Sequence, residues 1–309
     1  MSNKVLIIGG SGFIGSNIAE GLLKSEKKVI ILDKKFNPFF DYKLHNVDYI
    51  ITDNPENELD KINWKDIYQV FHLGGVTNPN SFQNLNYSID SDLKFTINLL
   101  THISNSKTIK LIYISSGGAI YSGKSNSWDE KELIKPISGY GLMKGLNELV
   151  IQQTAQNLKI PYLIIRPSNP FGRRQVNFGK QGLIATVLHS LKHNQEITIK
   201  GELKNSKDYI YIDDFVYLLL SLVDNLNAEG IFNIGAGRSY SIQEIIDTAK
   251  QITGKDVRFN NISKTNNDIS NFVLNNQKVL SYTNNQAYQF KSLREGMKEL
   301  WFWITENNI

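Results

Sequence analysis

A tyrosine and a lysine stand four residues apart in the segment Tyr140-Gly-Leu-Met-Lys144, a spacing that puts both on one face of a helix. A nearby ammonium group favours the phenolate form of tyrosine, which makes the phenol usable as an acid or base near neutral pH. Ser115 and Ser116 follow the apolar run 111–114, at the end of an expected parallel strand. Ligands gather at such strand ends. These groups could together move a proton to or from a substrate hydroxyl.

A glycine-rich turn near the start of the chain gives the second chemical signal. The run Lys4-Val-Leu-Ile-Ile-Gly-Gly-Ser-Gly-Phe-Ile-Gly15 reads as an apolar strand, a glycine turn and the start of a helix. Such glycines let the backbone approach a pyrophosphate at a helix N-terminus. Asp33 ends the next apolar run, where a carboxylate can accept both hydroxyls of an adenosine ribose. Because Asp33 would repel a 2′-phosphate and no arginine follows it directly, the sequence predicts NAD(H) rather than NADP(H).

The apolar pattern predicts the scaffold that positions these residues. Six short apolar runs read as buried parallel strands, at residues 5–8, 29–32, 49–51, 70–73, 111–114 and 162–165. Helical patterns lie between several of them, at 14–23, 93–103 and 142–158. The alternation predicts an α/β fold with a Rossmann-type doubly wound parallel sheet. We expect an NAD-binding domain over 1–170, a smaller substrate-binding lobe over 171–309, and a segment near 207–238 that returns to the first domain.

Composition limits the classes of protein to consider. The chain has 309 residues, of which 41% are hydrophobic and 21% charged, and can bury a large core. It has no cysteine, which excludes disulfides and thiolate catalysis. No apolar run reaches about eighteen residues and a strand pattern begins at once, so we expect no membrane span and no signal peptide, and a cytoplasmic protein. The net charge of +4 is spread without a basic block, so no nucleic-acid partner is expected.

The histidines invite a metal or base assignment that the pattern does not favour. His189 and His193 have helical spacing but lack a third ligand, so we expect a surface helix and no metal. His72 ends an apolar run, and we expect it to be a hydrogen-bonded core residue.

Taken together, the motifs resemble the extended short-chain dehydrogenase/reductases, the NAD-dependent epimerase/dehydratase family that acts on nucleotide sugars. The resemblance covers nearly the whole chain, from Val5 to the helix around 293–296. The segments that carry it are 9–15, Asp33, 52–53, 71–75, 115–121, 140–144, 166–169, 171–172, 208–214 and 232–237.

The resemblance implies a role for each matching residue. Tyr140 would be the catalytic acid/base, and Lys144 would activate it and anchor the nicotinamide ribose. Ser116 would be the hydroxyl partner, with Ser115 as the alternative. The cofactor site would comprise Gly9, Gly12, Phe13, Ile14, Gly15, Asp33, Asp53, Leu73, Gly74, Gly75, Tyr140 and Lys144. The nucleoside-diphosphate sugar would contact Ser116, Asn169, Leu183 and Lys207, with Ile197 and Ile199 near the base. A homodimer through the helices near 84–105 and 139–157 is also implied.

Departures from the family pattern bear on the reaction. Gly117 stands where many members carry the catalytic Ser or Thr, so the preceding serine is preferred. Gly118-Ala119 supply no Asp-Glu pair, so the elimination carried out by dehydratases is not expected. Lys207 and Thr265 stand where arginines usually grip the diphosphate, and lysine cannot form a bidentate fork. Four other cations could compensate in part: Arg173, Arg174, Arg258 and Lys264.

The missing arginines favour one reaction slightly over another. An epimerase must retain a loosened keto intermediate through nucleotide and phosphate contacts, whereas a reductase releases its product in each cycle. We therefore expect NAD(H)-dependent hydride transfer at C4 of a nucleoside-diphosphate hexose, by a 4-keto-6-deoxy-sugar reductase that uses a dTDP- or UDP-linked sugar and supplies surface polysaccharide precursors. The alternative is a UDP-glucose-type 4-epimerase. A third hypothesis, a catalytically idle NAD-binding sensor, is disfavoured because Ser116, Tyr140 and Lys144 are all present.

Overall fold

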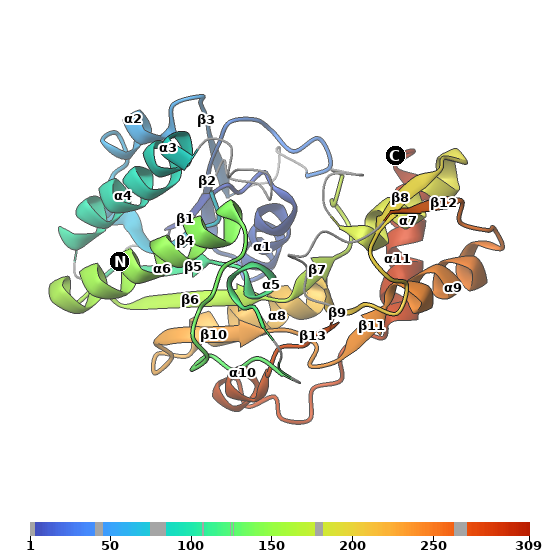
Figure 1. Cartoon of the computed structure of the whole chain (residues 1–309). Helices are drawn as coiled ribbons and strands as arrows, with labels where there is room; N and C mark the ends of the chain where they lie inside the picture. Colours follow the sequence, from blue (N-terminus) through green and yellow to red (C-terminus); the bar gives the residue numbers. More distant parts are fainter. Residues whose placement is uncertain are drawn as a thin grey trace.

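A seven-stranded parallel sheet forms the centre of the protein (Figure 1). The computed structural model describes residues 4–40, 46–74, 85–106, 108–123, 125, 127–176, 182–262 and 271–309. In sheet order the strands are β10 (Gly230–Ile234), β6 (Tyr162–Pro167), β5 (Lys110–Ile114), β4 (Ile67–His72), β1 (Lys4–Ile8), β2 (Lys28–Asp33) and β3 (Val47–Ile51). The chain order reverses direction between β1 and β4, the point where doubly wound sheets bind their ligands. The expected fold class is confirmed.

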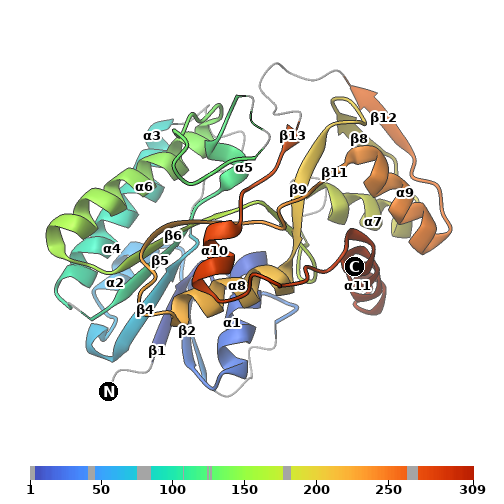
Figure 2. The same cartoon turned by 90° about the horizontal axis from the view of Figure 1, so that it is seen from below.

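Helices cover both faces of this sheet (Figure 2). One face carries α2 (Pro55–Leu59), α4 (Lys94–Ser104) and α6 (Gly139–Leu158), and the other carries α1 (Phe13–Lys24) and α8 (Ile212–Asp224). Alternate side chains of β1 enter the two cores, Val5 and Ile7 on the side of α1, Leu6 and Ile8 on the side of α4. Because both faces are buried, the strands are almost continuously apolar. None of the helices in the described ranges has both the length and the apolar composition needed to span a bilayer.

Two shorter helical segments lie at the carboxyl edge of the sheet, and a third lies at the opposite edge. The helix α3 (Leu85–Ser88) continues into a π-helical turn at Ile89–Leu93, which leads into α4. The short helix α5 (Gly117–Ile120) follows β5 and packs against α6. A 3-10 turn, Trp64–Asp66, precedes β4.

Most of the remaining elements build a smaller lobe beside the sheet. Its helices are α7 (Leu183–His193), α9 (Ile242–Thr253) and α11 (Leu293–Glu306), and β8 (Ile197–Lys200) pairs with β12 (Phe259–Ile262). A small sheet is centred on β9 (Ser206–Tyr211), which pairs with β7 (Asn169–Phe171), β11 (Ser239–Ser241) and β13 (Asn271–Phe272). The helix α10 (Gln277–Tyr282) packs against β10 and α8. Capping boxes fix the starts of α9 and α11, through Ser241 and Ser292 respectively.

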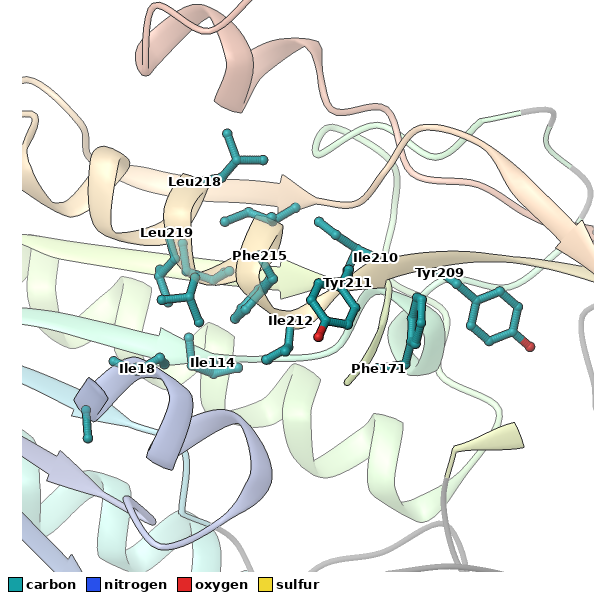
Figure 3. Close-up of a cluster of buried hydrophobic side chains, with 14 of the residues drawn as sticks. Ile18, Ile114, Phe171, Tyr209, Ile210, Tyr211, Ile212, Phe215, Leu218 and Leu219 are labelled. Atoms are coloured by element: carbon teal, nitrogen blue, oxygen red, sulfur yellow. The ribbon is translucent and has the colours of Figure 1, made fainter. Parts of the chain in front are cut away.

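The segment 207–238 contributes to both the sheet domain and the smaller lobe. Its strand, β9, belongs to the sheet of the lobe, whereas α8 packs on α1 and β10 extends the central sheet beside β6. The apolar core follows the same path, from Ile114 of β5 through Ile212 and Phe215 of α8 to Tyr209 of β9 (Figure 3). This shared core joins the two lobes at the edge of the sheet where the candidate site lies.

Candidate active site

The turn between β1 and α1 presents open backbone at a helix N-terminus. Gly9 has a φ of +81°, and its N–H donates to the Leu32 carbonyl at 2.9 Å. A Cβ on Gly15 would lie 2.4 Å from the Gly9 carbonyl oxygen, so only glycine allows this close contact between turn and helix. Gly12 is the N-cap of α1 and has no side chain to occupy the free amides. The turn therefore fits a pyrophosphate.

Asp33 is held in a fixed orientation at the end of β2. Its Oδ2 accepts a hydrogen bond from the Ser11 amide at 2.8 Å, and its Oδ1 accepts one from the Lys34 amide at 2.7 Å. Each carboxylate oxygen has further lone pairs and can accept hydroxyl donors. The carboxylate thus suits the diol of a ribose.

A cavity of about 760 Å³ connects these features. Six of the residues expected to bind the cofactor line it: Gly9, Gly12, Asp33, Asp53, Leu73 and Gly74. Phe13 and Ile14 pack against the core at the start of α1, and Gly75 lies outside the described residues. The two turns almost touch, because a Cβ on Gly9 would lie 3.0 Å from the Gly74 nitrogen. The open amides, the ribose acceptor and the size of the cavity all fit NAD.

Ser116 and Tyr140 meet where α5 and α6 pack together. Ser116 is the N-cap of α5, and its hydrogen bond to Tyr140 lowers the pKa of the phenol, although burial has the larger effect and raises that pKa. The contact depends on Gly141, because a Cβ there would lie 2.1 Å from the Ala119 carbonyl oxygen. Ser138 caps α6 by accepting a hydrogen bond from the Gly141 amide at 3.0 Å. The start of α6 is thereby fixed against the end of β5.

Lys144 lies one helical turn beyond Tyr140 and is buried. Its Nζ donates to the Ile114 carbonyl at 2.8 Å and lies 5.8 Å from the centroid of the Tyr140 ring. Burial lowers the pKa of Lys144 to about 8, although the carboxylates of Asp92 and Glu148 raise it. The pKa of Tyr140 is raised and not lowered, so the direction expected from the lysine is wrong for the protein alone. Burial of the phenol outweighs the hydrogen bond with Ser116, which lowers this pKa.

The two candidate serines face opposite ways. The buried Ser115 hydroxyl donates to Glu148 Oε1 at 2.5 Å, whereas Ser116 contacts Tyr140. A side chain at Gly117 has little room, because a Cβ there would come within 3.0 Å of both Leu274 Cδ1 and the Pro167 carbonyl oxygen. Of the three successive positions, Ser116 is the one that brings a hydroxyl to the tyrosine.

Sequence reasoning missed the buried ion pair behind these serines. Glu148 and Arg166 are nearly inaccessible, and Arg166 Nη2 lies 2.6 Å from Glu148 Oε2. Arg166 Nη1 also donates to the Tyr121 hydroxyl at 2.6 Å, and that hydroxyl donates to Asn233 Oδ1 at 3.1 Å. The spacing of Glu148 could have pointed to it, because residues 140, 144 and 148 follow one another at four-residue intervals on one helix face. The network ties α6 and β6 to β10.

The expected sugar-side residues lie on elements of the lobe. Asn169 of β7 donates its amide hydrogen to the Asp208 carbonyl at 2.8 Å, Lys207 lies in β9, and the half-buried Leu183 begins α7. Asp208 is buried and accepts from the amides of Ala236, Gly237 and Leu274, while burial raises its pKa to about 6. Asp208 therefore fixes the strand that carries Lys207.

The arginines that could compensate for the missing diphosphate-binding arginines make contacts within the protein. Arg173 pairs with Glu20 and Asp213, at 3.3 and 2.9 Å, and Arg174 pairs with Glu20 at 2.5 Å. Arg258 donates to the Asn194 carbonyl. Thr265 and Lys264 lie outside the described residues. The guanidinium groups of these three arginines thus have protein partners, and the compensation expected from them stays a prediction.

His72 is a hydrogen-bonded core residue, as its position at the end of an apolar run predicts. His72 Nε2 lies 3.0 Å from the Thr96 hydroxyl, and burial lowers the pKa of His72 to about 3, so it is neutral. The rings of His189 and His193 lie 4.3 Å apart on α7. Within the described ranges there is no cluster of three or more side chains that could hold a metal.

The sequence model of the NAD dependent epimerase/dehydratase family matches residues 5–235 of the chain. The chain belongs to this family. Its members are NAD-dependent enzymes, so the expectations of an enzyme and of NAD as cofactor are confirmed.

Relatives within the family carry out several reactions. A Methanocaldococcus jannaschii protein with the provisional name UDP-glucose 4-epimerase is 31% identical over 98% of this chain and 99% of its own length. The dTDP-4-dehydro-6-deoxyglucose reductase of Escherichia coli is 28% identical, and the match covers 80% of each protein. The Thermotoga maritima UDP-glucose 4-epimerase, solved with UDP-glucose, has a TM-score of 0.87 and 25% identity, and covers 99% of this chain and 100% of its own.

Proposed function

We propose that the protein transfers a hydride at C4 of a nucleoside-diphosphate hexose. The observation that carries this proposal is the contact between Ser116 and Tyr140, with the buried Lys144 one turn further along the same helix. These groups lie at the carboxyl edge of the sheet, where β1 and β4 also line the cofactor cavity. A hydroxyl pair next to a hydride donor suits the interconversion of a ketone and an alcohol.

Each residue has a defined part in the reductive direction. NAD(H), when bound, supplies the hydride to the C4 carbon. Tyr140 donates its phenolic proton to the C4 oxygen, while the Ser116 hydroxyl hydrogen-bonds that oxygen. Lys144 holds the cofactor ribose and stabilises the phenolate left after proton transfer. The ketone gains one hydride and one proton, and becomes the alcohol. Oxidation reverses both transfers.

The site also supplies residues for the sugar nucleotide. We assign Asn169 and Lys207 to the diphosphate and Leu183 to the base, because all three lie on the elements of the lobe that border the strand ends. Lys207 contributes a point charge, which binds phosphate without the bidentate geometry of arginine.

We favour the 4-keto reductase among the possible reactions. Protein groups already pair with Arg173, Arg174 and Arg258. Fewer charge-assisted hydrogen bonds are therefore available to bind the diphosphate of the substrate. Each such contact contributes about 1.5–3 kcal/mol. A weaker grip suits an enzyme that releases its product in every cycle. The E. coli reductase among the relatives supports this choice.

A 4-epimerase is the second candidate. It is favoured by the M. jannaschii relative, which matches over nearly the whole of both chains, and by the likeness to the T. maritima UDP-glucose 4-epimerase. The same Ser116, Tyr140 and Lys144 would serve it, with the hydride taken from C4 and returned to the opposite face.

One comparison of substrates separates the two reactions. The purified protein is given dTDP-4-keto-6-deoxyglucose with NADH and, separately, UDP-glucose without added cofactor. A reductase consumes one NADH for each keto sugar reduced and leaves UDP-glucose unchanged. An epimerase forms UDP-galactose without consuming NADH. Inactivity on both substrates and on their dTDP, UDP and GDP counterparts would contradict C4 chemistry.

We also propose a homodimer through α4 and α6. These helices pack together and expose three large apolar side chains: Ile97 is 45% exposed, Leu149 51% and Leu158 46%. A pair of such faces could bury one another. Light scattering of the wild type and of Leu149→Glu tests this, with a dimer expected for the first and a monomer for the second.

A further inference from the structure

The imidazole of His72 uses one of its two nitrogens within the protein. His72 ends β4, is only 1% exposed and lines the cofactor cavity. Its Nε2 lies 3.0 Å from the Thr96 hydroxyl, whereas its Nδ1 is hydrogen-bonded to none of the described residues. Buried polar atoms nearly always have a hydrogen-bond partner, so the unpaired nitrogen needs an explanation.

The contacts of Thr96 show which nitrogen carries the proton. The Thr96 hydroxyl donates its single proton to the Asp92 carbonyl at 2.9 Å, so it can only accept from His72. The imidazole proton is therefore on Nε2. Burial, and to a smaller extent the charge of Lys144, lower the pKa of His72 to about 3, so Nδ1 carries no proton at neutral pH. Nδ1 is a buried hydrogen-bond acceptor.

The edge of the ring that carries Nδ1 borders the cavity. The imidazole contacts the rings of Phe95 and Tyr113, with centroids 5.5 and 5.3 Å away. A Cβ on Gly74 would lie 3.8 Å from both Nδ1 and Cε1, so a side chain at residue 74 would stand against this edge. Gly74 has no side chain and lines the same cavity. A donor bound in the cavity can therefore approach Nδ1 past Gly74.

The order of the strands indicates which part of the cofactor supplies the donor. The strands β2, β1, β4 and β5 are successive neighbours in the sheet. Asp33, which suits the adenosine ribose, ends β2, and the glycine turn that fits the pyrophosphate follows β1. His72 ends β4, and Ser116 comes after β5. A dinucleotide that extends along this edge from Asp33 towards Ser116 passes β4 with its nicotinamide half.

We propose that His72 is a cofactor-binding residue whose Nδ1 accepts a hydrogen bond from a hydroxyl group of the nicotinamide ribose. Ribose hydroxyls are suitable donors, and a hydrogen bond in a poorly hydrated site is stronger than one in water. The proposal rests on the cofactor orientation described above and concerns NADH binding, which can be measured without a sugar.

The test compares two amide variants, each of which keeps one of the two ring positions. His72→Gln places its amide near the position of Nε2 and leaves no acceptor near Nδ1. We expect the Kd for NADH, measured by nucleotide fluorescence, to rise about three- to thirtyfold. The Kd for ADP, which lacks the nicotinamide ribose, should not change when it is measured by displacement of NADH. His72→Asn places its amide oxygen near Nδ1 and should keep the NADH affinity within about twofold of the wild type.

A control and a measurement on the unaltered protein complete the test. His193→Gln, at an exposed histidine of α7, should leave both dissociation constants unchanged. Nitrogen NMR of the wild type with isotope-labelled histidine does not depend on the folding of any variant. The Nδ1 resonance of His72, recognised by its pKa of about 3, should shift when NADH is added and should stay in place with ADP.

Any of four results would overturn the proposal. These are an unchanged NADH affinity in a folded His72→Gln protein, an equal loss of affinity for ADP, a folded His72→Asn protein that binds NADH as weakly as His72→Gln, and an Nδ1 resonance that does not respond to NADH. A wild type that neither reduces nor epimerises a nucleotide sugar would contradict the proposed function alone and leave these binding results intact.

Discussion

The cofactor side and the sugar side of the site are built in different ways. The centre of the cofactor side is one stretch of chain, because Gly9, Gly12 and Asp33 belong to a single βαβ unit, and residues near β3 and β4 complete the cavity. On the proposed sugar side, Asn169 and Lys207 come from two short strands that pair with each other, and the Asn169 amide donates to the Asp208 carbonyl across this pairing. The first arrangement suits a cofactor shared by many enzymes, and the second can be altered without disturbing it. Substitutions on the two sides should therefore have separable effects.

Tyr140→Phe should have the largest effect, and only on chemistry. The substitution removes the proton donor, and we expect kcat to fall by about 10²–10⁴-fold while the Kd for NADH stays nearly unchanged. Single-turnover kinetics and NADH fluorescence measure the two quantities. Tyr217→Phe, at a 47% exposed tyrosine on α8, is the control. Full activity of the Tyr140→Phe variant on its nucleotide sugar would refute the mechanism.

Asp33→Ser should alter the cofactor side alone. It removes the acceptor for the ribose hydroxyls and the charge that repels a 2′-phosphate, so the preference for NADH over NADPH should drop by about ten- to a hundredfold. The ratio of the two dissociation constants is the measurement. Asp48→Ser, at an exposed acid on β3, should leave the ratio unchanged. Tight NADPH binding by the wild type would contradict the assignment of Asp33.

Gly141→Ala should disturb the contact between α5 and α6, which brings Ser116 to Tyr140. The added methyl would lie 2.1 Å from the Ala119 carbonyl oxygen, which forces α6 away from α5. Overpacking of this kind lowers the free energy of unfolding by about 1–3 kcal/mol. Denaturant unfolding measures the loss. Gly118→Ala should cost much less, because its methyl meets nothing closer than 3.9 Å, and equal losses would argue against the steric explanation.

Lys207→Arg should have the smallest effect, and only on the sugar side. A bidentate guanidinium at this position of β9 should tighten nucleotide-sugar binding by up to about tenfold. Isothermal titration with the nucleotide sugar gives the change, and the NADH affinity should not move. Lys204→Arg, at an exposed residue paired with Glu202, is the control. Weaker binding in the Lys207→Arg variant would show that residue 207 does not face the diphosphate.

The sequence was a better guide to one side of the site than to the other. The strands, the glycine turn and Asp33 follow from local apolar runs and backbone requirements, and they could be recognised one βαβ unit at a time. The pairing of β9 could not be recognised in this way. It depends on hydrogen bonds that the Asp208 carboxylate accepts from the backbone amides of residues 236, 237 and 274. A strand-like run shows that a strand forms and does not show which sheet it joins.

The electrostatics of the site were also beyond the sequence. The spacing of Tyr140 and Lys144 correctly suggested that they share a helix face, but their pKa shifts depend on burial that only the packed structure defines. Glu148 could have been noticed from its spacing, whereas its partner Arg166 lies on another element.

The position of Leu274 has a consequence for chimeric proteins. Its side chain fills the space beside Gly117, and its amide hydrogen-bonds to Asp208, although residue 274 lies nearly forty positions beyond the end of the family match at residue 235. Exchanging the C-terminal segment between two relatives would therefore alter the space available for a side chain at position 117. This space decides whether the serine or threonine that contacts the tyrosine can stand at position 117 or must stand at position 116. Residues 116, 117 and 274 should be transplanted as a set, since a hydroxyl introduced at 117 becomes useful only after Leu274 is replaced by a smaller side chain.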